Sequence, residues 1–363
     1  MGEDARRFNR APANREEIVT IAMRGAVARF FALLALALPL DAGVARAAET
    51  VTVGTTFSIT DLPFFIGMKR GYFAAEGLDV TFVNLDSAAR MIAPLASGEL
   101  DLAAGGPSAG LYNAIARNIG IRIVADKSAT PPGRHSQTLL VRKELIDSGR
   151  VKTLADLKGL RVASAAPGSS AMGTLNRIYK MTGLKPTDIE RVYLGFPQQI
   201  AALRGGAADV AFPTEPFASE AVRQGYAVAF MTDDQIYPGH QISVMIYSDR
   251  FRTQRKAVAL AFMRAYLRAV RDQNAAIVDG RLAGKDAEEF IGLIADNTPV
   301  KDRDFLRSIN LSASDDDGRV NVESLKEDFE IFRAEGLIEG KITVDDALDP
   351  SFARAAVEAL ARR

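Results

Sequence analysis

Two short stretches of the sequence share one pattern. Residues 95–103 read LASGELDLA and residues 203–211 read LRGGAADVA, so a leucine, a glycine and an aspartate recur with a constant offset of 108 residues. In each stretch the glycine is placed to end a helix, and the aspartate begins a short hydrophobic strand. The repeat predicts two lobes with equivalent strand–loop–helix units, although a shared packing plan could produce it without duplication.

Hydrophobic and β-branched runs alternate with helical segments around these stretches. The expected strands cover residues 51–57, 79–85, 101–104 and 121–125 in the first half, and 160–164, 192–194 and 209–212 in the second. Alternation of this kind predicts an α/β fold class with parallel sheets covered by helices.

Two further strand-like runs, at 137–142 and 241–248, flank the second half. They indicate that the chain enters and leaves the second lobe by two crossings, which form a hinge. We expect lobe I to be discontinuous, comprising 48–136 and 249–363, and lobe II to comprise 137–248 with both hinge strands. After residue 249 the pattern is mainly helical, and we expect this extension to pack on lobe I.

The composition excludes several classes of protein. Of 363 residues, 48% are hydrophobic and 25% are charged, which is typical of a soluble globular protein. Lysine plus arginine (45) balances aspartate plus glutamate (45), so no overall positive field favours nucleic acid as a partner. The chain has no cysteine, which excludes disulfides, thiolate catalysis and cysteine-bound zinc.

The N-terminal region has the features of a secretory signal. Basic residues precede the uncharged run 30–40 (FFALLALALPL), and the small-x-small sequence Ala45-Arg46-Ala47 follows it. We expect residues 1–47 to be an N-terminal extension and a cleaved signal peptide, with Met23 as the natural start. Without cysteine no lipoprotein anchor can form, so a free rather than a membrane-tethered exported protein is expected.

The loops after the predicted strands form the candidate site, because ligands of parallel α/β sheets collect beyond the carboxyl ends of the strands. Their side chains are mostly hydroxyls and amides, suited to hydrogen-bonding a small polar solute between two lobes. The candidate ligand-binding residues are Thr56, Phe57, Ser58, Ser87, Arg90, Gly106, Ser108, Ser169, Ser170, Gln198, Thr214 and Glu215.

The charge of the solute stays open at this point. Arg90 and the helix N-termini favour an organic anion such as a sulfonate or a carboxylate, which is our preference. Glu215, with Phe57 and Phe196 as stacking partners, would instead favour an aromatic or pyrimidine-like amine.

Catalysis is not expected. Ser108 lies in a G-x-S-x-G sequence at 106–110, between a predicted strand and a helix, as a hydrolase nucleophile would. A hydrolase also needs a histidine beside the serine, and the only histidines, His135 and His240, precede the predicted hinge strands. There they are either pH- or ligand-sensing groups or ordinary loop residues. Two histidines without cysteine also argue against a metal site.

A set of motifs, taken together, resembles one known family over about residues 50–250, the nitrate/sulfonate/taurine-type (NitT/TauT) periplasmic substrate-binding proteins of ABC transporters. The motifs are 63–67 (PFFIG), 71–80 (GYFAAEGLDV), 95–101 (LASGELD), 154–163 (LADLKGLRVA) and Glu215-Pro216.

The resemblance implies a type II periplasmic-binding-protein fold, with two α/β lobes joined by a double-strand hinge. It implies capture of a small organic solute for an ABC permease in the inner membrane, by a monomer without a cofactor. The alternatives are a binding protein for a pyrimidine-like or aromatic amine, and an enzyme similar to thiamine-pyrimidine synthases. The absence of cysteine disfavours the enzyme, because those enzymes have a cysteine-rich site.

Overall fold

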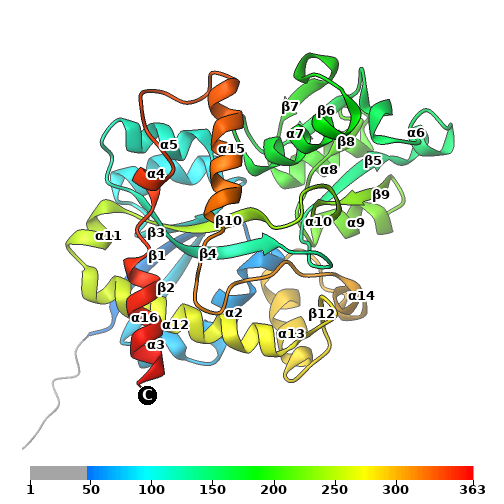
Figure 1. Cartoon of the computed structure of the whole chain (residues 1–363). Helices are drawn as coiled ribbons and strands as arrows, with labels where there is room; N and C mark the ends of the chain where they lie inside the picture. Colours follow the sequence, from blue (N-terminus) through cyan, green and yellow to red (C-terminus); the bar gives the residue numbers. More distant parts are fainter. Residues whose placement is uncertain (1–46, 363) are drawn as a thin grey trace, which may run out of the picture. The chain divides into compact units, whose positions relative to one another are not determined.

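The computed structural model describes residues 47–362, and two five-stranded sheets form their framework (Figure 1). The predicted signal peptide and the choice between Met1 and Met23 as the start lie outside the described residues. Within the described part of the chain, no helix is both long enough and apolar enough to cross a membrane.

The first sheet has the strand order β2-β1-β3-β10-β4. Strands β1, β2 and β3 are parallel, whereas β10 runs antiparallel between β3 and β4. The chain therefore returns from the second sheet to insert β10 into the first. The strands are β1 (Glu49–Thr55), β2 (Leu78–Asn84), β3 (Leu102–Gly105), β4 (Arg122–Thr130) and β10 (His240–Tyr247).

The second sheet repeats this arrangement in the order β7-β6-β8-β5-β9. Here β6, β7 and β8 are parallel, and β5 runs antiparallel between β8 and β9. Both sheets are thus mixed, where the sequence predicted purely parallel ones, and β9 was not predicted. The strands are β5 (Thr138–Arg142), β6 (Arg161–Ser164), β7 (Glu190–Tyr193), β8 (Val210–Ala211) and β9 (Ala227–Thr232).

The repeated sequence pattern has equivalent structural roles in the two sheets. Asp101 precedes β3, and its Oδ2 accepts a hydrogen bond from the backbone N–H of Thr52 in β1 at 3.0 Å. Asp209 precedes β8, and its Oδ2 accepts from the backbone N–H of Arg161 in β6, also at 3.0 Å. An aspartate at this position joins two neighbouring parallel strands, which explains why it recurs 108 residues later.

Helices cover both sheets. The helices before residue 248 are α2 (Leu62–Lys69), α3 (Tyr72–Ala75), α4 (Ile92–Ser97), α5 (Ala109–Ala116), α6 (Lys143–Asp147), α7 (Ser170–Thr182), α8 (Phe196–Arg204), α9 (Phe217–Arg223) and α10 (Asp233–Ile236). Short 3₁₀ helices include η1 (Ile59–Asp61) and η2 (Ala88–Met91). The helices after residue 248 are α11 (Asp249–Thr253), α12 (Lys256–Ala275), α13 (Ala287–Asn297), α14 (Arg303–Ser308), α15 (Val322–Ala334) and α16 (Ser351–Ala361), with a small hairpin of β11 (Ile277–Val278) and β12 (Arg281–Leu282) between α12 and α13.

The long helix α12 packs its apolar face on the core of the first sheet. Phe262 stacks on Phe73 of α3 with ring centroids 5.0 Å apart, and Tyr266 lies 5.4 Å from Phe64 of α2. All four rings are fully buried. Burying rings of this size supplies a large share of the hydrophobic stabilisation, which is what anchors the C-terminal extension to the first sheet.

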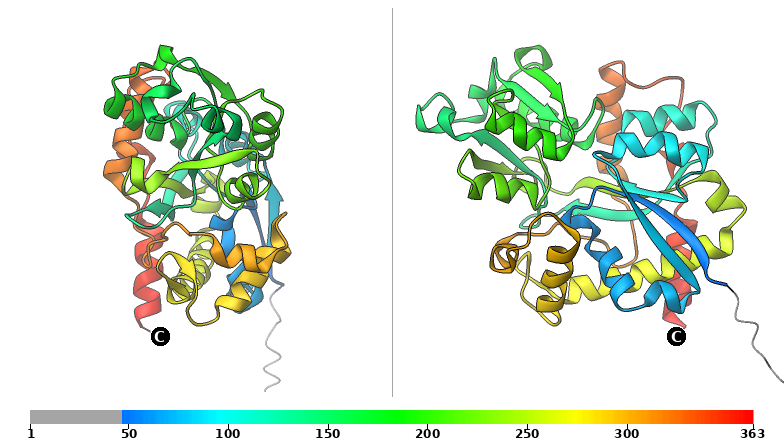
Figure 2. Two further views of the ribbon diagram at one scale, coloured as in Figure 1. Left: turned by 90° about the vertical axis from the view of Figure 1, so that its right-hand side faces the viewer. Right: turned by 180° about the vertical axis from the view of Figure 1, so that it is seen from behind.

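The C-terminal extension was expected to pack on lobe I alone. Helix α15 instead contacts α5, beside the first sheet, and α7, beside the second (Figures 1 and 2). Phe329 packs edge-on against Tyr112 of α5, in the same apolar cluster as Met172 of α7. Glu327 accepts a hydrogen bond from Arg177 of α7 at 2.6 Å. The C-terminal extension therefore supports the hinge region as well as the first sheet.

The division into lobes I and II with the stated boundaries stays a prediction, with one adjustment. Strand β10 lies within 137–248, the range predicted for lobe II, yet it pairs only with β3 and β4 of the first sheet in the described part of the chain. We therefore count β10 with lobe I.

Candidate binding site

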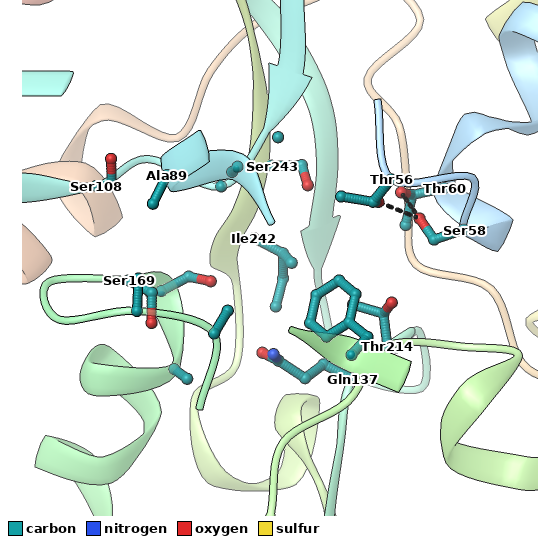
Figure 3. A pocket seen from close by; sticks show the side chains of 18 residues that line it. Thr56, Ser58, Thr60, Ala89, Ser108, Gln137, Ser169, Thr214, Ile242 and Ser243 are labelled. Carbon is teal, nitrogen blue, oxygen red and sulfur yellow. Dashed lines mark hydrogen bonds between the residues drawn. The ribbon is translucent and has the colours of Figure 1, made fainter. Parts of the chain in front are cut away.

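A pocket lies where loops that follow strands of both sheets meet the two crossings of the chain (Figure 3). We call it the cleft pocket. It is lined by residues from the loops after β1, β2 and β3 on one side, and after β6, β7 and β8 on the other. The lining residues are Thr56, Ser58, Thr60, Ala88, Ala89, Gly105, Gly106, Ser108, Gln137, Ala165, Ala166, Ser169, Ser170, Ala171, Phe196, Thr214, Ile242 and Ser243.

The two sides of the cleft pocket touch through backbone hydrogen bonds. The N–H of Ala109 donates to the carbonyl of Gly168 at 2.8 Å, and the N–H of Ile59 donates to the carbonyl of Glu215 at 3.1 Å. Gly168 has a φ of +60°, and a Cβ there would lie 2.4 Å from the Cβ of Ala109. Only glycine fits this close approach without displacing the opposite loop.

A row of hydroxyl groups follows β1 on one wall of the pocket. Thr56 Oγ1 donates to Ser58 Oγ at 3.3 Å, and Ser58 Oγ lies 2.9 Å from Thr60 Oγ1 (Figure 3). Between them Phe57 has a φ of +50°, a left-handed conformation that costs a non-glycine residue about 1 kcal/mol or more. Its ring packs against those of Phe65 and Phe82, which holds the turn in place.

A buried ion pair lies behind this row and fixes it. The N–H of Ser58 donates to Asp61 Oδ2 at 2.9 Å, and Asp61 Oδ1 lies 2.6 Å from Lys127 Nζ. Lys127 Nζ also donates to the carbonyl of Ala104 at 3.3 Å. Both charged side chains are fully buried, and neither lines the pocket. The pocket therefore presents hydroxyls, while the charges behind them neutralise each other.

Three lining side chains have a buried polar atom without a hydrogen-bond partner among the described residues: Gln137 Oε1, Ser169 Oγ and Thr214 Oγ1. Buried polar groups are nearly always hydrogen-bonded in folded proteins, because leaving one unpaired costs free energy. Polar atoms left unpaired around one pocket are therefore available to a ligand.

Seven of the predicted ligand-binding residues come together in the cleft pocket. These are Thr56, Ser58, Gly106, Ser108, Ser169, Ser170 and Thr214. Ser108 is also the N-cap of α5, where its Oγ accepts from the N–H of Leu111 at 3.3 Å. Phe57 lines a neighbouring cavity of about 480 Å³ together with Phe196, which lines both. Ser87 and Gln198 do not line the cleft pocket.

Arg90, predicted to clamp an anion, does not reach the pocket either. Its side chain is 70% exposed and pairs with Asp86 one turn earlier at 3.4 Å. The neighbouring Ala88 and Ala89 line the pocket instead. The position of Arg90 thus gives no support to a role as a clamp.

Glu215 is turned away from the pocket and bonded within its own segment. Its Oε1 accepts from Ser219 Oγ at 2.8 Å, and its Oε2 accepts from the N–H of Ser219 at 3.0 Å. Burial raises the pKa of this carboxyl group to about 7, although the bonds from Ser219 oppose the shift. The prediction that Glu215 would bind a ligand amine therefore gains no support.

The sequence analysis missed the lining residues at the crossings. Gln137 precedes β5, and Ile242 and Ser243 lie within β10. Both runs were recognised as hinge strands, but only the loops of the lobes were considered as sources of ligand contacts. Thr60, which belongs to the same predicted loop as Ser58, also lines the pocket.

Neither histidine lies beside Ser108 in the cleft pocket. His240 is fully buried between Asp233 and Asp328: its Nδ1 lies 3.0 Å from Asp233 Oδ2, and its Nε2 lies 2.9 Å from Asp328 Oδ2. We call these three residues the histidine cluster. Burial alone would lower the pKa of His240, but the two carboxylates raise it to about 10, so the imidazole is positively charged at neutral pH.

Metal binding finds no support in the described residues, which contain no group of three or more histidine, aspartate or glutamate side chains arranged to hold a metal ion. His135, at the other crossing, contacts a single carboxylate, that of Asp234, at 3.3 Å.

Two α/β units joined by two crossings, with a pocket between them lined by loops of both, define a class of binding protein whose halves meet around a solute. The chain belongs to the NMT1-like family, which matches residues 45–277.

Individual relatives agree with this assignment. A stretch of 146 residues is 31% identical to a protein of Escherichia coli (strain K12) described as an aliphatic sulfonates-binding protein; it covers 40% of this chain and only 43% of that protein. The periplasmic nitrate-binding protein NrtA from Synechocystis PCC 6803 is similar in structure, with a TM-score of 0.71 and 16% identity over 86% of this chain and 89% of that one. The alkanesulfonate-binding protein SsuA from Xanthomonas axonopodis pv. citri, bound to MOPS, has a TM-score of 0.64 and 21% identity over 84% and 99% of the two chains.

These findings confirm the resemblance stated from the sequence motifs. They also confirm the fold class, two α/β units of the periplasmic-binding-protein type.

Proposed function

We propose that this protein is the periplasmic solute-binding component of an ABC importer. It binds a small organic anion, a sulfonate or a carboxylate, between lobes I and II and presents it to a permease in the inner membrane. The family, the sulfonate- and nitrate-binding relatives and the position of the cleft pocket between the two sheets support this proposal.

The chemistry of the cleft pocket is the observation that favours an anion. Eight of its lining residues carry a hydroxyl, and none carries a formal charge. Hydroxyls and backbone N–H groups at helix starts can bind an anionic oxygen without a cationic side chain. Here α5 begins after Ser108 and α7 begins after Ser169, both in the pocket lining.

The amine alternative has less support from the same geometry. An ammonium or a ring N–H cation buried in a protein needs a carboxylate partner. No acidic side chain lines the cleft pocket, and Glu215 is already bonded to Ser219. A neutral aromatic solute without polar groups would be compatible with Phe196 but would leave the hydroxyls of Ser169 and Thr214 unpaired.

A thermal-shift experiment tests the proposed class of solute. The purified chain is heated with ethanesulfonate, propanoate and their hydroxy derivatives, and separately with aromatic and pyrimidine-like amines. A solute at 100 times its dissociation constant should add about 2.7 kcal/mol to the free energy of unfolding, and therefore raise the midpoint by several degrees. If only the amines raise the midpoint, the anion proposal is wrong.

The periplasmic location is tested by expressing the full chain in a Gram-negative host and sequencing the N-terminus of the protein in the periplasmic fraction. The proposal expects cleavage after Ala47, a free protein and a monomer on size-exclusion chromatography. Recovery of the protein with an intact N-terminus in the cytoplasm would contradict the location.

A further inference from the structure

Gln137 is held rigidly at the point where the chain first crosses between the sheets. Its backbone forms a bridge with Thr214, and its carbonyl accepts a hydrogen bond from the N–H of Asp233 at 3.1 Å. Only 3% of the residue is exposed. The side chain thus extends from a fixed backbone into the cleft pocket.

The hydrogen bond of the side-chain amide fixes which of its atoms faces the pocket. Nε2 donates to the carbonyl of Phe212 at 3.0 Å. With the amide turned over, two acceptor oxygens would face each other, so this orientation is the only one that satisfies Phe212. Oε1 is therefore the free end, buried and without a partner among the described residues. Figure 3 shows the head of Gln137 directed into the pocket below Ile242.

From this geometry we infer that Gln137 selects the solute by accepting a hydrogen bond from an N–H or O–H group on it. This inference rests on the proposed function and narrows it. A carbonyl oxygen can only accept, so the anionic end of the solute, which also accepts, cannot satisfy it. The ligand is then an anion with a second, donor-bearing group, such as a hydroxyalkyl sulfonate or carboxylate.

The physical basis of selection is the cost of leaving Oε1 unpaired. In a closed cleft, a solute without a donor displaces water from this atom and forms no hydrogen bond to replace the one that water made. Sites built to hydrogen-bond a hydroxyl or amine discriminate strongly against the analogue that lacks it, whereas apolar contacts discriminate weakly. Binding should therefore depend more on the donor than on the length of the alkyl chain.

Isothermal titration calorimetry on matched pairs tests the inference. The pairs are ethanesulfonate with 2-hydroxyethanesulfonate, and propanoate with 3-hydroxypropanoate. For the wild-type protein, the donor-bearing member of at least one pair should bind about 10-fold or more tightly than its partner. In Gln137→Met, which keeps the shape of the side chain and removes the acceptor, the difference should shrink to about 2-fold or less.

Gln199→Met is the matched control. Gln199 is also fully buried, its Nε2 donates to the carbonyl of Leu194 at 2.9 Å, and its Oε1 also lacks a partner, but it does not line the cleft pocket. This variant should discriminate as the wild-type protein does. If Gln137→Met does not fold, the wild-type comparison still decides, because it needs no variant.

The outcomes separate the two proposals. Equal binding of both members of every pair by the wild-type protein overturns the role of Gln137 and leaves the anion-binding function standing. A preference that persists in Gln137→Met also overturns it. If the wild-type protein binds none of these anions, the proposed class of solute fails and this inference fails with it.

Discussion

The cleft pocket and the histidine cluster are both polar and both buried, yet they are built in opposite ways. The pocket is lined by neutral groups, several of which have no partner, such as Ser169 Oγ and Thr214 Oγ1. The cluster, at the start of β10, consists of charges that contact each other directly: His240 lies between Asp233 and Asp328, with Tyr237 stacked on the ring at 4.3 Å. One arrangement leaves room for a ligand, and the other holds elements together.

The energetic cost of an unpaired group explains the difference. An unpaired buried hydroxyl costs about 1–3 kcal/mol, which a folded protein can tolerate at a few positions until a ligand arrives. An unpaired buried charge costs considerably more, so buried charges occur in pairs. The comparison shows that three neutral polar side chains with unpartnered atoms gather around the cleft pocket, whereas the buried charges of the histidine cluster contact one another.

Replacing His240 by leucine should produce the largest effect on stability. The variant leaves Asp233 and Asp328 buried without a counter-charge, and breaking a buried pair in this way costs about 3–5 kcal/mol. Urea unfolding at pH 7 measures the loss. His135→Leu is the control, because that side chain is 21% exposed and contacts one carboxylate; it should cost less than about 1 kcal/mol. Equal losses in the two variants would contradict the special role of the cluster.

The same variant tests the pH dependence of stability. The folded-state pKa of His240 is about 10 and its unfolded value is about 6.5. A raised histidine pKa stabilises the folded state below the unfolded pKa, and this contribution disappears as the pH rises through the folded value. The stability difference between wild type and His240→Leu should therefore shrink between about pH 6.5 and pH 10.

Glu215 acts in a different pH range and does not disturb this test. Burial raises its pKa to about 7, so the folded state binds its proton more tightly, and its contribution to stability falls as the pH rises from 4.5 to 7. Both proteins contain Glu215, and the effect cancels in their difference. A difference that stays constant from pH 6 to pH 10 would show that His240 is not charged in the folded protein.

Thr214→Val should weaken solute binding without destabilising the protein. The change removes a buried hydroxyl that has no hydrogen-bond partner among the described residues, so stability should not fall. Loss of the hydrogen bond to the solute should weaken binding by about 3- to 10-fold. Titration calorimetry and thermal unfolding measure the two quantities. Thr55→Val is the control, because Thr55 Oγ1 is also buried and unpartnered but does not line the pocket. Loss of affinity in Thr55→Val as large as in Thr214→Val would argue against direct contact.

Arg90→Gln should have the smallest effect. The side chain is exposed and paired with Asp86, and it does not line the cleft pocket. We expect the affinity for any anion found to bind to stay within about twofold of wild type, since exposed ion pairs contribute little. A loss of 10-fold or more would restore Arg90 as an anion clamp and would mean that charge, not hydroxyls, determines binding.

Part of the site could have been read more fully from local sequence. Arg90 follows Asp86 by four residues, and Ser219 follows Glu215 by four, which is the spacing at which side chains on one helical face meet. Both charged residues therefore had a local partner that competes with a ligand. Thr56, Ser58, Ser169 and Thr214, which follow β1, β6 and β8, line the cleft pocket because a strand followed by a helix fixes where its loop must lie. Their contact with a solute stays a prediction.

The sequence by itself determined the local elements and their repetition. Asp101 and Asp209, 108 residues apart, mark equivalent strand starts, because capping and hydrophobic periodicity act between residues close in the chain. Only the tertiary structure decided that β10 enters the first sheet antiparallel, that His240 meets Asp328, and that Gln137 faces the cleft pocket. These contacts join residues far apart in the chain; His240 and Asp328, for example, are 88 positions apart. Which partner each residue contacts depends on how the two sheets pack, a property that no local pattern encodes.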